Sequence, residues 1–174
     1  MTDSGAVLRR CFLALAAVSA IGTAVELALS RHWTSTIQLI PWFALAVTAV
    51  AFVLVVVRPG RRSLRIVRVL AVAVVLTAGF GVFEHVLANY DAAPLDFRYT
   101  DRWATMSATS KWWAAASESV GPSPTLAPGV LAQSAMCLLF ATIGHPALGG
   151  RAQDEAGPVE AVPVGTADSV QRTR

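Results

Sequence analysis

The sequence predicts an all-α membrane protein, a bundle of four transmembrane helices with an outer loop and interfacial helix between spans three and four. Four long apolar runs carry this prediction, at about residues 11–30, 36–57, 69–90 and 126–148. About 20 helical residues at roughly 1.5 Å each cover the roughly 30 Å hydrocarbon core, so each run is long enough to cross a bilayer. The arginines gather at one set of ends of these runs, which predicts the orientation of the bundle.

Composition supports the membrane class. The chain has 174 residues, of which 55% are hydrophobic and only 14% are charged, whereas soluble domains average about 25% charged residues. Residues 32–57 and 119–150 contain no Asp, Glu, Lys or Arg. The net charge of +3 does not indicate a nucleic-acid binder, because the basic residues stand at the ends of apolar runs, where they meet lipid headgroups. The expected partner is the lipid bilayer.

The short loops predict which side each end of the bundle faces. Five arginines lie between the second and third spans, against one between the first and second. By the positive-inside rule, both termini and the 58–68 loop are cytoplasmic, and residues 91–125 are outside. The skew to 13 Arg over one Lys indicates a GC-rich bacterial genome, and hence the bacterial inner membrane. The loop arginines contact headgroups, or alternatively form a specific anionic-lipid or partner site: Arg58, Arg61, Arg62, Arg65 and Arg68.

The first apolar run has a second interpretation. Arg9 and Arg10 followed by CFLALAAVSA resemble a signal peptide, with a small-residue cleavage site at residues 18–20. Apolar character continues to Leu29, however, which is longer than a usual signal-peptide core and favours a retained span. Cleavage would leave three spans in the same orientation.

Residues 1–148 are expected to form one transmembrane domain, followed by a disordered cytoplasmic tail at 149–174, which is rich in Gly, Pro, Ala and mixed charge. Within the outer loop 91–125, Asp101 is expected to cap a helix running to about Val120. Tryptophans in that helix fit interface depth, and the helix is expected to lie on the outer leaflet or over the bundle.

Each span carries a polar or ionisable group near its outer end. Glu26, Gln38, His85 and Gln133 all fall about 5–9 Å from the outer ends, at about 1.5 Å per residue. Small residues line the same helix edges, and such edges pack closely. The predicted polar cluster therefore comprises Glu26, Gln38, Glu84, His85, Asn89 and Gln133.

This cluster admits two interpretations. Intramembrane ionisable groups are a functional hypothesis by default, because burying them is costly. Glu26 would then hold His85 as an imidazolium, or neutral His85 would ligate a metal while Glu84 or Glu26 orients it. Alternatively, these side chains are interhelical hydrogen-bond partners or reach the interface from near the span ends. The cofactor, if any, is not indicated.

The segments ELALSRHWTSTIQLIPW, EHVLANY, LAPGVLAQ and GHPAL resemble those of a group of uncharacterised small bacterial four-span membrane proteins. The resemblance covers about residues 8–148 and excludes the tail. It implies four spans with a long outer loop before the last, and it implies no activity.

The sequence carries no P-loop, dinucleotide, zinc-protease or nucleophile-elbow motif. The favoured function is a noncatalytic membrane protein, a subunit or partner-binding module that meets another membrane protein or its own copies. The alternative is a small-molecule, proton or metal-ion binding or transport component that uses the polar cluster. A membrane enzyme is a third option, with Glu84, His85, Asp91 and Asp96 doing acid–base work at the outer surface.

Overall fold

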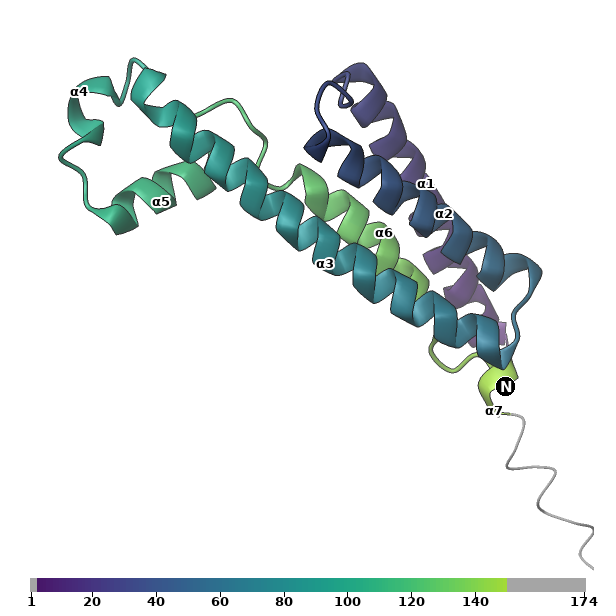
Figure 1. The fold of residues 1–174 in the computed structure, drawn as a ribbon. Coiled ribbons are helices and arrows are strands. Elements are labelled where there is room, and N and C mark those ends of the chain that lie inside the picture. Colours follow the sequence, from purple (N-terminus) through teal and green to yellow (C-terminus); the bar gives the residue numbers. More distant parts are fainter. Residues whose placement is uncertain (1–2, 150–174) are drawn as a thin grey trace, which may run out of the picture.

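A computed structural model describes residues 3–149 and is all-α over that range, as predicted (Figure 1). Four longer helices form the main body: α1 (Asp3–Leu29), α2 (Ile40–Val57), α3 (Arg61–Ala92) and α6 (Ala127–Thr142). The shorter helices are η1 (Ile37–Leu39), η2 (Ala93–Leu95), α4 (Thr100–Trp103), α5 (Ala108–Ala116) and α7 (Pro146–Gly149). The tail predicted at 149–174 lies outside the described residues, apart from Gly149 at the end of α7.

Within residues 3–149, three helical segments are long and apolar enough to cross a membrane: Ser4–Leu29, Ile37–Val57 and Arg61–Leu95. The fourth apolar run forms a shorter helix than expected, because α6 has 16 residues and so extends for only about 24 Å. The run continues to residue 148, but Gly144 adopts a φ of 60° and Pro146 starts the separate helix α7. This turn interrupts the helix that the sequence pattern predicts.

Two helices begin earlier than the apolar runs that predict them. α1 begins at Asp3 and not near residue 11, and α3 begins at Arg61 and not near residue 69. Arginine is a good helix former, so the basic flanks continue the helices instead of ending them. α3 starts directly after Gly60, whose backbone is extended, and Pro59 before it breaks the helical path from α2.

The bundle core is built from small side chains. α6 packs against both α1 and α3, and α2 packs against α3. Ala16, Ala71 and Ala135 are each at most 1% exposed, which lets helix backbones approach closely. Ser134 donates a 2.8 Å hydrogen bond to the carbonyl of Ala16, so α1 and α6 are also joined by a polar contact. Cleavage near residue 20 would remove Ala16 from this core.

α3 extends well past the start of α6. Its 32 residues make it about 48 Å long, against a hydrocarbon core of about 30 Å. A Cβ added at Gly81 would lie 3.1 Å from the Cβ of Pro128, so α6 begins beside Gly81. Beyond that level α3 projects from the bundle and carries α4 and α5 at its end (Figure 1). We call residues 93–125 the outer module.

The single helix predicted from Asp101 to Val120 is wrong. The structure has two helices there, α4 and α5, and Asp101 lies inside α4. The break comes at Ser107, whose backbone is extended and whose hydroxyl accepts a hydrogen bond from the amide of Ser110. Serine favours this capping geometry over a helix interior.

Candidate functional site

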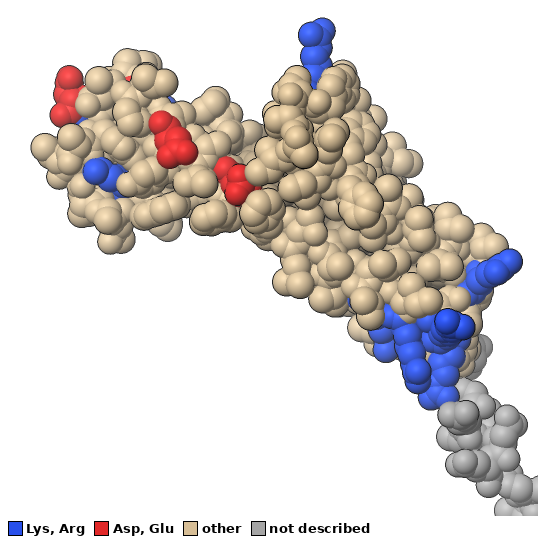
Figure 2. All heavy atoms as spheres, viewed as in Figure 1, with Lys and Arg blue, Asp and Glu red and all other residues tan. Residues whose placement is uncertain are grey.

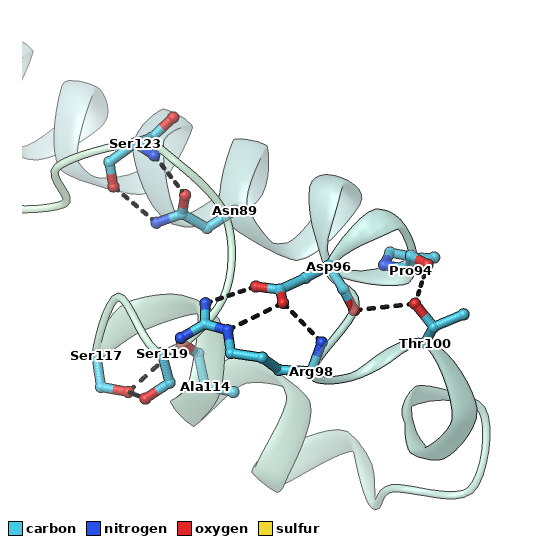
Figure 3. Close-up of polar contacts among 9 residues, drawn as sticks. All are labelled: Asn89, Pro94, Asp96, Arg98, Thr100, Ala114, Ser117, Ser119 and Ser123. Atoms are coloured by element: carbon cyan, nitrogen blue, oxygen red, sulfur yellow. Dashed lines mark hydrogen bonds and ion pairs between the residues drawn. The ribbon is translucent and has the colours of Figure 1, made fainter.

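Asn89 lies near the end of α3 and is completely buried. Its side-chain nitrogen donates to the carbonyls of Ala115 (3.2 Å) and Ser123 (2.8 Å), and lies 3.4 Å from the hydroxyl of Thr125. Its side-chain oxygen accepts from the amide of Ser123 at 2.8 Å (Figure 3). One amide therefore joins α3, the end of α5 and the segment that leads into α6.

Two further side chains hold that segment. The Nδ1 atom of His85, one turn before Asn89, lies 2.8 Å from the carbonyl oxygen of Pro124. Because a carbonyl only accepts, Nδ1 carries the proton. Glu118 accepts a 2.7 Å hydrogen bond from the amide of Thr125. The residues 123–125 thus form a clamp segment whose backbone polar groups are satisfied by side chains.

The other predicted cluster residues lie apart from this clamp. Gln38, in η1, accepts two 2.8 Å hydrogen bonds from the amide and hydroxyl of Thr34. Glu26 on α1 and Gln133 on α6 are exposed, and Glu84 is half-buried. Within residues 3–149, no hydrogen bond joins any two of the six predicted residues. The structure brings His85 and Asn89 to one segment and leaves the others with separate surroundings.

His32 lies within electrostatic range of both Glu26 and His85. The pKa of His32, in the loop between α1 and η1, is lowered by burial and then by the positive charge of His85, while Glu26 raises it. The loop is fixed by Trp42, whose indole donates a 2.8 Å hydrogen bond to the carbonyl of His32. No set of three His, Cys, Asp or Glu side chains in the described part of the chain is placed to hold a metal ion.

The outer module has its own small core. The ring of Tyr90 lies 5.3 Å from that of Trp103 and 4.7 Å from that of Trp112, centroid to centroid. Trp103 is only 7% exposed, so it packs inside the module. A shallow groove of about 400 Å³ lies on the module, lined by Tyr99, Arg102, Met106, Ser110, Trp113 and Ser119 among others.

An ion pair fixes the turn between η2 and α4. The Arg98 guanidinium contacts the two carboxylate oxygens of Asp96 at 2.6 and 3.0 Å, and the Arg98 amide donates to the same carboxylate (Figure 3). The hydrogen bonds from Arg98 lower the pKa of Asp96 from 3.8 to about 2. Asp96 is therefore a stable anion at physiological pH and a poor candidate for a general acid.

The opposite end of the bundle is basic. In Figure 2, Lys and Arg side chains gather where α3 begins, whereas acidic side chains appear over the outer module and its connection to the bundle. Arg68 donates to the hydroxyl of Thr142 at 2.9 Å and to its carbonyl at 3.1 Å, which satisfies the last turn of α6. The predicted headgroup residues are all exposed here: Arg58, Arg61, Arg62, Arg65 and Arg68.

Sequence reasoning missed the clamp segment. Pro122 and Pro124 do signal that residues 121–125 are not helical, and such a segment needs partners for its backbone polar groups. That signal does not say which side chain supplies them. The chain matches no family model, no curated protein and no solved structure.

Proposed function

We propose that the chain is a noncatalytic multi-pass membrane protein, a subunit whose outer module docks onto another membrane protein. The observation that carries this proposal is a set of large apolar side chains exposed outside the bundle on a well-held module. Phe97 is 89% exposed, Leu95 88% and Trp113 74%. Large apolar side chains exposed outside a bundle are typical of interaction surfaces, and the Asn89 contacts hold the end of α5 and residues 123–125 against α3.

The proposed topology has four spans, with both termini on the cytoplasmic side of the bacterial inner membrane. α6 is short, but its sides are covered by α1 and α3, so lipid need not surround it. Its last turn is held by Arg68 at the basic end, and its first turn lies beside Gly81. The positive-inside rule places the basic end in the cytoplasm.

Reporter fusions test this topology. A reporter that is active only in the cytoplasm is fused after residue 174 in one version and before residue 1 in another. Four spans predict activity from both fusions, whereas three spans predict opposite results for the two ends. A periplasm-active reporter inserted after Ala104, in the loop between α4 and α5, is expected to be active.

Site-specific crosslinking tests the docking surface. A photoreactive amino acid replaces Phe97 on the outer module, and the matched control replaces Leu76, which is 70% exposed within the apolar part of α3. Residue 97 is expected to give one discrete protein adduct in cells, and residue 76 to give none. Adducts of twice the chain's mass would identify a second copy as the partner. A monodisperse monomer without adducts at residue 97 contradicts the proposal.

A second candidate function is proton or small-molecule binding at the outer ends of α1 and α3. The supporting observation is that His32, in the loop after α1, lies within electrostatic range of both Glu26 on α1 and His85 on α3. Glu26→Gln and His85→Ala are then expected to abolish ligand stabilisation or proton-coupled uptake in vesicles, while Asp91→Asn leaves both unchanged. Unaltered behaviour of the first two variants would eliminate this candidate.

A further inference from the structure

Arg9 is placed differently from the other arginines at the basic end. It lies on α1 one turn before Phe12, whose ring packs 5.4 Å from that of Phe140 on α6. This position directs the Arg9 side chain toward the end of α6 and the loop to α7. Arg9 is half-buried, and its Nε atom is enclosed without a hydrogen-bond partner among the described residues. A partly desolvated guanidinium without a counter-ion is unfavourable, so this position calls for an anion.

His145 lies in the loop between α6 and α7, next to Ala147 and Leu148, which pack against the same apolar cluster as Phe12. Burial lowers the pKa of His145, and the positive charge of Arg9 lowers it further. The Nδ1 atom of His145 accepts a 3.2 Å hydrogen bond from the amide of Ala147. In the neutral imidazole the proton therefore resides on Nε2, which is left as a donor.

No carboxylate balances Arg9 within residues 4–148, whose side chains the structure describes. The acidic residues in that range belong to the outer ends of α1 and α3 or to the outer module: Glu26, Glu84, Asp91, Asp96, Asp101 and Glu118. The neighbouring guanidinium of Arg68 is already engaged with Thr142. The face shown in Figure 2 has clustered basic side chains and no acidic ones at this end.

We propose that Arg9 and His145 bind the phosphate of an anionic phospholipid headgroup at the basic end of the bundle. A guanidinium matches phosphate through paired N–H donors, and a neutral imidazole N–H completes the set. A lipid is the favoured source of the phosphate because the site lies at the ends of helices long and apolar enough to cross a membrane. The inference rests on the membrane topology proposed above, but not on the docking function of the outer module.

Native mass spectrometry of the full-length protein tests this site. The chain is released from nanodiscs that contain phosphatidylglycerol or, separately, phosphatidylcholine, and bound lipid is read from the adduct mass. Arg9→Gln is compared with Arg10→Gln, the adjacent exposed arginine with the same change in charge. Arg9→Gln is expected to lower phosphatidylglycerol retention about tenfold, since charge-assisted bonds to phosphate are the strong ones. Arg10→Gln is expected to change it less than about twofold because an exposed charge contributes little.

Further variants and lipids in the same experiment serve as controls. Arg9→Lys keeps the charge and should retain part of the binding, while His145→Ala should weaken it; both are checked for an unchanged unfolding midpoint in detergent. Equal loss in the Arg9 and Arg10 variants would overturn the site in favour of diffuse charge. Equal retention of phosphatidylcholine would overturn headgroup selectivity. Displacement of the lipid by millimolar inorganic phosphate would assign the site to soluble phosphate instead. None of these outcomes depends on whether residue 97 crosslinks to a partner protein.

Discussion

Asn89 and Ser123 hold each other through two hydrogen bonds of 2.8 Å, one in each direction. The side-chain amide of Asn89 thereby pairs with the backbone of Ser123 as a second peptide group would. Because Asn89 is on α3 and Ser123 precedes α6, this pair fixes how the outer module meets the bundle.

Replacing Asn89 with Leu is expected to loosen the outer module. The change leaves the half-buried amide and carbonyl of Ser123 without their partners, which costs about 2–6 kcal/mol at roughly 1–3 kcal/mol per unsatisfied group. Hydrogen exchange of residues 97–125 should accelerate strongly, while exchange in α2 stays slow. Gln133→Leu, at an exposed position on α6, is the control. Unchanged exchange in the module would show that Asn89 does not hold it.

Gly121→Ala is expected to be far more damaging than Gly144→Ala. Both glycines have positive φ, 77° and 60°, so each substitution carries a strain of about 1 kcal/mol. At Gly121 a Cβ would also meet the Asn89 Cα at 2.6 Å, whereas Gly144 has open space around it. Thermal unfolding in detergent should separate the two variants clearly. Equal midpoints would contradict the close approach of Gly121 to Asn89.

Arg68→Gln is expected to destabilise the basic end by about 1–2 kcal/mol, because it removes two charge-assisted bonds to the last turn of α6. Arg65→Gln, an exposed position one turn earlier in α3, is the matched control and should have little effect. The double variant with Thr142→Val measures the coupling. Additive effects of Arg68→Gln and Thr142→Val would indicate that the bond from Arg68 to the Thr142 hydroxyl contributes nothing, because the bond to the carbonyl remains in the valine variant.

Asp96 is expected to titrate near pH 2 in the folded protein. Its pKa is depressed below the ordinary value of 3.8, so the contact with Arg98 contributes stability above pH 3.8 and loses it as the pH falls toward 2. Carboxyl-carbon NMR of labelled Asp measures the midpoint. Arg98→Gln should return it toward 3.8, and an unshifted midpoint in the native chain would contradict the ion pair.

Much of the fold could be predicted from the sequence. The apolar runs at about 11–30, 36–57 and 69–90 predicted the all-α class, and they overlap the long apolar helices found at Ser4–Leu29, Ile37–Val57 and Arg61–Leu95. Helix ends were less predictable, because arginine at residues 61–68 extends a helix as readily as it flanks one. The split of the outer helix at Ser107 depends on a local hydrogen bond that competes with helix formation.

The candidate site was predicted only in part. The sequence pattern drew attention to Asn89 and His85 because they share an edge of α3 with small residues. It grouped them with Glu26, Gln38 and Gln133 by depth, since depth along a helix follows from residue number alone. Which side chains contact one another also depends on the rotation of each helix about its axis. It depends too on the hydrogen-bonding groups that the connecting segments place beside the helices. Asn89 and His85 form hydrogen bonds with the 123–125 clamp segment. That segment has no hydrophobic periodicity from which its position could be predicted.

The sequence by itself therefore determined the class of the protein, because transfer of apolar side chains from water depends on composition and length. It also determined the segregation of arginine to one end. Only the tertiary structure decided that α6 lies beside Gly81 and that α3 carries a module beyond the bundle. Likewise, only packing set Arg9 apart from Arg10, since hydrogen-bond partners and desolvation arise between segments that are distant along the chain.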